Sequence, residues 1–409
     1  MGEPVMKLIG LKEAQRIIHK NINPLESIQV PLQEAPGCVV ASDMFARIDS
    51  PSVDASLKDG FAVRAADLVE AGKDQPITLE MVGTATAGGQ VPPDISPGQT
   101  VKVTTGAPLP SQADAVVPVE QVRAENRAIR FSHSVVSGQD ILPKGSDVSR
   151  KQIVATAGET VTPGLLGLLA ASGHNNVDVV RPPRVAIIST GDEVVAPGRQ
   201  LPPGKLYASN LTTLDAWCRK LGSETRCLIV GDNTTDTTRS IDTIIAWADA
   251  VVISGGAWGS ERDTVGPALE ALNWQQLFHG VRMRPGKGSG FGLLAGKPVF
   301  MLPGGPSANL TAFLQLVLPG LQQMAGYKRT GLPEVVAALK SGIKNRHADW
   351  TRFVFGKLEM NNQVFRFEPL NLPSRLLSIA RADSLAVIPE GDTDLRASSY
   401  ISVQVLGFS

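Results

Sequence analysis

The chain has 409 residues, of which 43% are hydrophobic and 19% are charged, as in a globular protein with room for several domains. Basic and acidic residues balance at 39 each, which excludes a broadly basic surface of the kind that binds nucleic acid or an anionic membrane. The three cysteines, at positions 38, 218 and 227, have no spacing that suits a disulfide framework or a zinc site.

The first stretch of the chain, MGEPVMKLIG, lacks the charged region and the following apolar region of a signal peptide. No later apolar run approaches the ~20 residues that are needed to span a bilayer. Together with the small number of cysteines, these features predict a cytoplasmic protein without a membrane segment.

The first third of the chain is rich in turn residues and short extended runs. A helix is predicted from Leu11, because Ala14, Ile17 and Ile18 recur at helical spacing. A short apolar helix with a Thr-Pro start and a Gly stop is expected within residues 158–178. Between them, alternating apolar and polar residues predict a β-rich region with half-buried strands in ITLEMVGTA, TVKVTTG, DAVVPVE and AIRFSHSVV.

After the RPP triplet at Arg181, buried strands alternate with amphipathic helices. The expected strands are RVAIIS, ETRCLIV, VVIS, LFHGVRM and KPVFML. The expected helices begin at Ser209 or Asn210, in DTTRSIDTIIAWADA, in TVGPALEALN and at Ser307 as an N-cap. This alternation predicts a doubly wound, mostly parallel α/β domain. Beyond about residue 331, a small all-β domain is predicted from FVFGKLEM, QVFRFEP, SLAVIPE and SYISVQVLGF.

The segments that follow the predicted strands carry the functional signal. In an open parallel sheet, ligands bind outside the carboxyl ends of the strands, so we expect these segments to meet in one crevice. Each of them carries glycine, charge or both: Thr190-Gly191-Asp192-Glu193, Gly231-Asp232, GGAWGSERD from Gly255 to Asp263, Arg284-Pro285-Gly286-Lys287 and Pro303-Gly304-Gly305-Pro306-Ser307.

The residue types at these strand ends suit a phosphorylated ligand with a divalent cation. Glycines let backbone N–H groups approach phosphate closely, a helix N-terminus adds partial positive charge, and Arg284 and Lys287 add full charges. Carboxylates suited to a hard cation such as Mg²⁺ are those of Asp192, Glu193, Asp232 and Asp263. Taken singly, each segment is more often a tight turn, a solvated loop or a helix cap than a ligand site, and only their convergence favours a pocket.

Two segments come close to nucleotide-binding motifs without matching them. GVRMRPGKGS has five residues rather than four before Gly-Lys, and Gly288 stands where a Walker loop needs Ser or Thr. GKGSGFG does not match G-x-G-x-x-G, and the five histidines show no arrangement typical of a catalytic triad. Neither a P-loop NTPase nor a Rossmann dehydrogenase is supported.

Motifs along nearly the whole chain resemble those of the molybdopterin molybdenumtransferases, the family of the bacterial MoeA proteins and the E-domain of gephyrin. They stand in the order and spacing of that family: DASLKDGFAVRAAD (Asp54 to Asp67), TGAPLPSQADAVVPVE (Thr105 to Glu120), GSDV (Gly145 to Val148), STGDEVVAPG (Ser189 to Gly198), ISGGAWGSERD, RPGKG and LPGGPSA (Leu302 to Ala308). The first two motifs and STGDE are the most specific.

The resemblance implies an elongated subunit of four domains. We expect a helical linking domain at residues 1–50 and 146–183, a β-rich domain at 51–145, an α/β molybdopterin-binding domain at 184–330 and a C-terminal β-barrel at 331–409. The family resemblance also implies a homodimer, in which the β-rich part of one subunit completes the crevice of the other.

The implied reaction inserts molybdenum from molybdate into adenylylated molybdopterin, with Mg²⁺ and with release of AMP. The implied protein partners are a molybdopterin adenylyltransferase and apo-molybdoenzymes.

Positions that match the family's functional residues, or that continue its motifs, give the following candidates. Catalytic roles are expected for Asp59, Thr105, Asp147, Glu193, Asp263 and Lys287. Ligand binding is expected for Thr190, Gly191, Asp192, Ser254, Gly255, Gly256, Trp258, Arg284, Pro303, Gly304, Ser307 and Ser374, and metal binding for Glu193, Asp232 and Asp263.

Several positions that resemble the molybdate side of the site depart from the family pattern. GGAWGSERD stands where the family has GGVSVGxxD, so that Trp258 replaces a small residue. KPGKP and LPGNPVS have become RPGKG and LPGGPSA, with Gly305 and Ala308 in place of Asn and Ser. A family arginine falls at Phe355, although Arg352 is near enough to substitute for it after a shift.

These departures leave two interpretations of the function open. One is an active molybdenumtransferase with an altered anion site, or one that serves a variant cofactor. The other is a paralogue that binds molybdopterin, a nucleotide or a partner protein as a carrier or scaffold. Without the family pattern, Asp59 and Thr105 would be a turn acid and a turn cap. Trp258 is expected at the crevice wall against a pterin or adenine face, with packing under its loop or in a dimer interface as the alternative.

Overall fold

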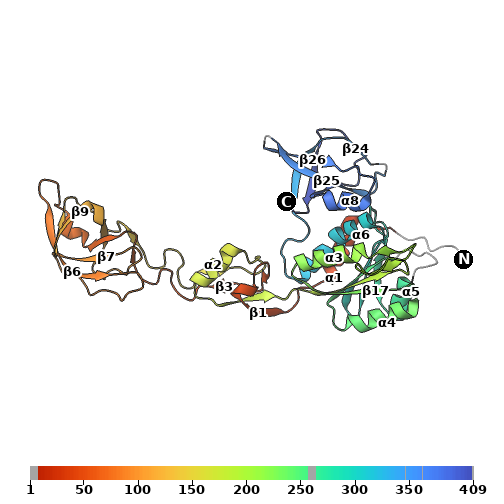
Figure 1. Ribbon diagram of the computed structural model, residues 1–409, viewed down its shortest axis with the longest axis horizontal. Helices are drawn as coiled ribbons and strands as arrows, with labels where there is room; N and C mark the ends of the chain where they lie inside the picture. Colours follow the sequence, from red (N-terminus) through yellow and green to blue (C-terminus); the bar gives the residue numbers. More distant parts are fainter. Residues whose placement is uncertain (1–7, 257–263, 346, 362, 408–409) are drawn as a thin grey trace.

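The computed structural model describes residues 8–256, 264–345, 347–361 and 363–407. The molecule is elongated: a β-rich unit lies at one end, a small linking unit in the middle, and an α/β unit with a β-barrel stacked on it at the other end (Figure 1). Across the described ranges, no helix is long and apolar enough to cross a membrane. The predicted elongated subunit with β-rich, α/β and β-barrel parts is confirmed.

The β-rich unit is a six-stranded sheet with the order β8 (Ala115–Pro118), β5 (Gly60–Val63), β7 (Gln99–Val103), β6 (Ile77–Ala85), β10 (Ala128–Phe131) and β9 (Val122–Glu125). Alternate residues of its strands enter two apolar clusters: Phe61 lies in one cluster with Phe131, and Ala62 lies in the other with Val101. The alternating runs that predicted strands here are therefore confirmed as β6, β7, β8 and β10.

The linking unit joins the β-rich unit to the rest of the chain through two segments that run side by side. Its strands are β1 (Ser27–Pro31), β2 (Val39–Val40), β3 (Met44–Phe45), β12 (Ile153–Ala155) and β13 (Asn176–Val180), and β4 (Ala55–Ser56) and β11 (Ile141–Leu142) pair at the start of the β-rich unit. The helix α2 (Pro163–Ala171) begins as predicted, because Thr162 accepts a hydrogen bond from the backbone of Leu165.

The α/β unit has a six-stranded sheet with the order β17 (Glu224–Val230), β14 (Arg184–Thr190), β18 (Ala250–Ser254), β22 (Lys297–Leu302), β21 (Gly290–Leu294) and β19 (Gln275–His279). The first four strands are parallel, and β21 runs antiparallel to both of its neighbours.

Helices cover both faces of this sheet. Val185 and Ile187 of β14 pack in one apolar cluster with α3 (Ser209–Lys220), whereas Ala186 and Ile188 pack in a second cluster with α4 (Thr234–Ile245) and α5 (Val265–Ala271). Burial on both faces explains the nearly continuous apolar runs of β14 and β18. The predicted doubly wound domain is confirmed.

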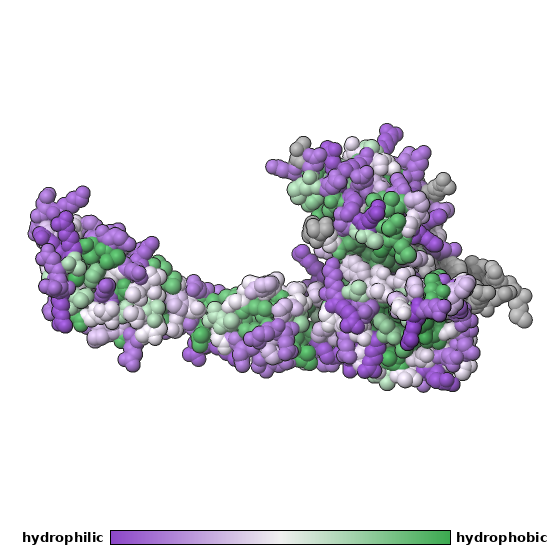
Figure 2. All heavy atoms as spheres, viewed as in Figure 1, coloured by the Kyte–Doolittle hydropathy of each residue, from purple (hydrophilic) through white to green (hydrophobic). Residues whose placement is uncertain are grey.

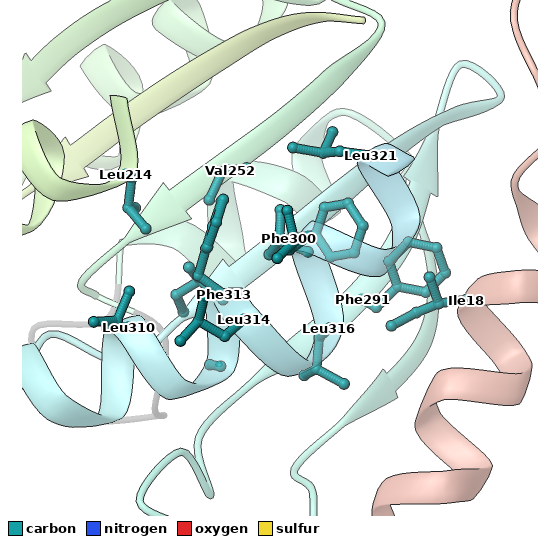
Figure 3. Packing of buried hydrophobic residues seen from close by; sticks show 14 of the residues in the cluster. Ile18, Leu214, Val252, Phe291, Phe300, Leu310, Phe313, Leu314, Leu316 and Leu321 are labelled. Carbon is teal, nitrogen blue, oxygen red and sulfur yellow. The ribbon is translucent and has the colours of Figure 1, made fainter. Parts of the chain in front are cut away.

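The first helix, α1 (Leu11–Asn21), belongs by packing to the α/β unit. Ile18 lies in the same apolar cluster as Phe291 and Phe300, as Figure 3 shows from close by. A Cβ on Gly320 would come within 2.9 Å of Ile22 Cδ1, so this glycine allows the helix to approach closely. The expected domain boundaries group residues 1–50 with the linking domain, whereas the apolar face of α1 packs in the core of the α/β unit.

A long helical segment follows β22 and consists of α6 (Pro306–Ala312), a π-helical turn (Phe313–Val317) and α7 (Leu318–Met324). The residue at the N-cap position is Gly305, and Pro306 is the first helical residue. The expectation that Ser307 caps this helix is wrong, because the fixed φ of proline favours the position that Pro306 takes.

The β-barrel closes through a pairing of β25 with β27, in the order β25 (Thr351–Asn361), β26 (Val364–Pro369), β23 (Glu334–Leu339), β29 (Tyr400–Val405) and β27 (Ser384–Ile388). The short pair β24 (Ile343–Lys344) and β28 (Asp394–Leu395) and the helix α8 (Arg375–Arg381) accompany it. The strand β20 (Met283–Arg284) leaves the α/β unit and pairs with β25. The single strand predicted for LFHGVRM is thus two strands in different sheets.

Candidate functional site

The carboxyl ends of β14, β17, β18 and β22 open onto a crevice of ≈ 820 Å³. The residues that follow these four strands and line the crevice are Thr190, Gly191, Glu193, Asp232, Gly255, Gly256, Gly304 and Pro306. The pair β15 (Val194–Val195) and β16 (Leu206–Tyr207) forms part of its wall. Four of the strand ends that were expected to converge therefore do so.

Glycines in the crevice stand where no side chain fits. A Cβ on Gly255, whose φ is +98°, would lie 2.8 Å from the carbonyl oxygen of Thr190. A Cβ on Gly256 would lie 2.8 Å from Thr190 Oγ1, and one on Gly191 would lie 2.7 Å from Glu193 Oε2. The backbone at these turns therefore lies close to whatever fills the crevice. The N–H groups of Gly191 and Gly255 already donate to the carbonyls of Val230 and Leu302, at 3.0 Å and 3.1 Å.

Hydroxyl groups at the floor of the crevice differ in how they are bonded. Ser254 Oγ accepts hydrogen bonds from Asn309 Nδ2 at 2.9 Å and from Asn210 Nδ2 at 3.5 Å. Thr190 Oγ1 is buried and has no hydrogen-bond partner among the described residues. A buried hydroxyl without a partner is costly, so a ligand atom that bonds to it gains affinity.

Asn210 and Asn309 bond to the crevice floor, and neither was predicted as a site residue from the sequence. Asn210 Nδ2 also donates to the carbonyl of Gly304 at 2.8 Å, and Asn309 Nδ2 donates to that of Pro303 at 2.9 Å. Together they join the ends of β18 and β22 and fix the shape of the floor. Their only signal in the sequence was a place near a helix start, which a capping role explains equally well.

The acidic residues lie on one side of the crevice. Asp192 and Asp232 bond reciprocally: the backbone N–H of each donates to the carboxylate of the other, at 3.3 Å and 3.0 Å. Glu193 and Asp232 line the crevice, whereas the backbone carbonyl of Asp192 accepts a hydrogen bond from Lys205. Asp263 and Trp258 lie outside the described residues.

The donor set fits a magnesium ion that also contacts a phosphate. The described residues contain no cluster of three or more metal-ligating side chains. Mg²⁺ in phosphate-transferring sites is commonly held by one or two carboxylates together with phosphate oxygens and waters. Glu193 and Asp232 supply two such carboxylates at one crevice.

Arg284 does not line this crevice. It lines a second cavity of ≈ 530 Å³, at the junction with the barrel, together with Lys344 and Arg352. Arg284 and Arg352 are paired residues of β20 and β25. The described lining of this cavity includes no acidic side chain. The expectation that all strand ends meet in one crevice is therefore wrong for Arg284, because β20 leaves the sheet for the barrel.

Lys287 and Phe355 are two further positions that the sequence singled out, and their contacts are as follows. Lys287 lies beside Trp350, with Nζ 5.9 Å from the ring centroid. Phe355, which stands where the family has arginine, is buried in the apolar core. Any positive charge at this cavity must come from neighbours such as Arg352.

Asp59 and Thr105 form a small bonded pair in the β-rich unit. Asp59 Oδ1 accepts hydrogen bonds from the backbone N–H of Thr105 at 2.6 Å and from its hydroxyl at 2.9 Å. These bonds hold the pKa of Asp59 below its ordinary value. Asp147 lies where the chain returns from the β-rich unit to the linking unit, and its backbone N–H donates to the carbonyl of Ser50. Figure 1 shows that the β-rich unit is remote from the α/β unit of the same chain.

The barrel also reaches the crevice. Ser374 caps α8 by accepting a hydrogen bond from the backbone of Leu377, and the next residues, Arg375 and Leu376, line the crevice. Ser307 is the second residue of α6 and lies outside the crevice lining. Arg375 was missed in the sequence, because α8 was not predicted there.

Comparison with known proteins is consistent along the chain. Residues 9–173 match the family described as "MoeA N-terminal region (domain I and II)". Residues 186–323 match the family described as "Probable molybdopterin binding domain". The second match contains every residue of the α/β unit that lines the crevice.

Similar proteins extend over the full length. The "Molybdopterin molybdenumtransferase 2" of Mycobacterium tuberculosis is 30% identical over 402 residues, which cover 96% of this chain and 98% of that protein. The "Molybdopterin molybdenumtransferase" of Nostoc sp. is 31% identical over 413 residues, covering 98% and 94%. A crystal structure of the molybdopterin biosynthesis MoeA protein from Pyrococcus horikoshii has a TM-score of 0.87 and 31% identity, covering 98% of this chain and 100% of that chain.

Proposed function

Because the chain belongs to the molybdopterin molybdenumtransferase family, we propose that it inserts molybdenum from molybdate into adenylylated molybdopterin and releases AMP. The observation that carries the proposal is the crevice at the ends of β14, β17, β18 and β22, with its glycine turns and two carboxylates. A phosphorylated pterin needs backbone donors for its phosphates and a fixed floor for its ring system, and this crevice has both.

Backbone donors and one hydroxyl bind and orient the ligand. Gly256 and Gly304 bring the main chain to the crevice wall without a side chain that would shield its N–H groups. Thr190 offers a buried hydroxyl that has no partner among the described residues. Asn210 and Asn309 keep the floor rigid, so the ligand loses little energy to rearrangement of the protein.

Glu193 and Asp232 would hold Mg²⁺ in this crevice, and Asp263 is the third expected ligand. The ion, when bound, neutralises phosphate charge as the phosphoanhydride opens. The reciprocal bonds between Asp192 and Asp232 orient the Asp232 carboxylate before the ligand arrives.

The second cavity supplies the charges for molybdate. Arg284, Lys344 and Arg352 surround it, and a tetrahedral oxyanion needs donors of this kind. These residues compensate for the apolar side chain of Phe355. The anion site is thereby altered rather than lost.

The active unit in this proposal is a homodimer. Asp59 and Thr105 are remote from the crevice of their own chain, so they act only in the crevice of a partner copy. Phe45, Ile48 and Ile153 of the linking unit are 51%, 48% and 50% exposed, and Figure 2 shows hydrophobic surface over this unit. Exposed apolar area of this kind favours contact between subunits.

The test of the reaction uses purified protein, adenylylated molybdopterin, Mg²⁺ and a molybdate series. AMP release and reconstitution of an apo-molybdoenzyme are followed together. We expect both products, with AMP release that saturates as molybdate rises and a half-saturating concentration that increases in Arg352→Gln. Tight pterin binding without AMP release at any molybdate concentration would instead identify a carrier or scaffold.

The composite site is tested by mixing two inactive variants, Asp59→Asn and Asp232→Asn, under subunit exchange. Each heterodimer would have one crevice with both acids intact, so equal mixing should restore about a quarter of the wild-type activity. Recovery of nothing beyond the two separate variants would show that both acids act within one chain.

A further inference from the structure

Arg375 is the one basic side chain among the described residues that line the crevice. The acidic side chains in the same lining are Glu193 and Asp232. A ligand with several phosphate charges meets two carboxylates there, and among the described side chains of the lining only Arg375 can offset them. Arg375, which comes from the barrel, is therefore the described side chain whose charge favours a phosphate in this crevice.

The position of Arg375 is set by helix packing. It is the first residue of α8, directly after the capping Ser374, and α8 packs against α6 at the crevice. Its Nη1 lies 3.6 Å from the place where a Cβ on Gly305 would stand. The guanidinium thus lies beside the turn between β22 and α6, within van der Waals distance of where a side chain at position 305 would begin.

The guanidinium is available for a ligand as far as the described residues go. Arg375 is exposed and makes no ion pair or hydrogen bond with any residue in the described part of the chain. No contact with a described residue therefore has to be broken before it can bond to a ligand. A planar guanidinium can bond two oxygens of one phosphate at once, which a lysine ammonium cannot reproduce.

We propose that Arg375 binds a phosphate group of the molybdopterin ligand in this crevice and so determines specificity for the phosphorylated form. This inference rests on the proposed function, since it names the residue that recognises the ligand of that site. The phosphate is favoured over molybdate because Arg375 shares its cavity with the glycine turns, whereas Arg284, Lys344 and Arg352 surround a separate cavity. Because Arg375 belongs to the barrel, ligand binding also fastens the barrel to the α/β unit.

The experiment compares wild-type protein with Arg375→Gln, Arg375→Lys and the matched control Arg381→Gln, which removes an exposed arginine at the other end of α8. The dissociation constants of molybdopterin and of adenylylated molybdopterin are measured at two ionic strengths, and the half-saturating molybdate concentration is measured separately. Melting temperature and circular dichroism verify that each variant is folded.

We expect Arg375→Gln to weaken the binding of both pterin ligands by about ten- to a hundredfold, with an intermediate loss in Arg375→Lys and none in Arg381→Gln. The affinity of the wild type should also fall more steeply with salt than that of Arg375→Gln. The half-saturating molybdate concentration should be the same in all four proteins at saturating pterin ligand.

Three outcomes would count against the inference. Equal pterin affinity in the wild type and in Arg375→Gln would overturn the role of Arg375 and leave the proposed function intact. A change confined to the molybdate concentration would overturn the assignment to phosphate. Failure of the folded wild-type protein to bind either pterin ligand would refute the proposed function itself, and the inference with it.

Discussion

Replacing Gly255 with alanine is expected to damage the crevice at one defined point. The glycine has a φ of +98°, and a Cβ there would lie 2.8 Å from the carbonyl oxygen of Thr190 and 3.1 Å from its hydroxyl. Two separate effects follow, a strained backbone and a steric conflict. The backbone of Thr190 cannot move away easily, because Thr190 pairs with Val230 of β17 and the preceding residue, Ser189, pairs with β18 as well.

The magnitude follows from these two effects. A left-handed backbone costs an alanine ~1–2 kcal/mol. Forcing a methyl group into filled space costs ~1–3 kcal/mol. Gly255→Ala should therefore lower the free energy of unfolding of the α/β unit by about 2–5 kcal/mol. For a domain of this size, the melting temperature falls by ~2–4 °C for each kcal/mol.

Gly296→Ala is the matched control. Gly296 also has a positive φ, +75°, but a Cβ there would meet nothing within 4 Å. Its expected loss is therefore the backbone strain alone, ~1–2 kcal/mol. Calorimetric melting and the affinity for molybdopterin would be measured for both variants. The affinity should fall only in Gly255→Ala. Equal losses of stability and affinity in the two variants would refute the steric account of the crevice turn.

Two further changes test contacts outside the crevice floor. Burial tends to raise the pKa of Asp249, but hydrogen bonds from Arg181 and from the backbone N–H of Arg184 lower it overall. Asp249→Asn should thus cost about 3 kcal/mol of stability at pH 7. In urea titrations the difference from wild type should begin to shrink below about pH 4, where Asp249 of the unfolded chain becomes protonated, and should shrink further as the pH falls through the lowered pKa of the folded protein. Ser374→Ala should lose ~1 kcal/mol of helix stability with the cap to Leu377, whereas Ser374→Asn should keep it, as hydrogen exchange of the α8 amides would reveal.

Most elements of the α/β unit could be predicted because its sheet is buried on both faces. Strands such as β14 and β18 are continuous apolar runs, and glycine or charge marks the point where each one ends. The parallel arrangement then brings the ends of four strands together without further information. For this reason, the position of the crevice could be predicted largely from the residues at each strand end.

Contacts between distant segments could not be read in the same way. The sequence shows that α1 has an apolar face, but not which unit will cover it. The sequence shows Arg284 after an apolar stretch. It does not show that β20 pairs with β25, because no residue near Arg284 indicates that pairing. Arg375 lies in a short helix with an N-cap serine whose orientation depends on how the barrel packs on α6. These choices are made by tertiary packing, which overrides local propensity.

The β-rich unit enters and leaves the linking unit at neighbouring points. Ser50 bridges to Val148, and the backbone N–H of Lys144 donates to Asp54 Oδ1 at 2.7 Å. A segment whose two ends meet is an interchangeable module: a short turn could replace it while the rest of the chain keeps its fold. In the homodimer proposed above, a subunit shortened in this way would keep its own crevice, and a full-length partner could still complete that crevice. The shortened subunit could not complete the crevice of its partner. The β-rich surface could therefore change without any change in the fold of the α/β unit.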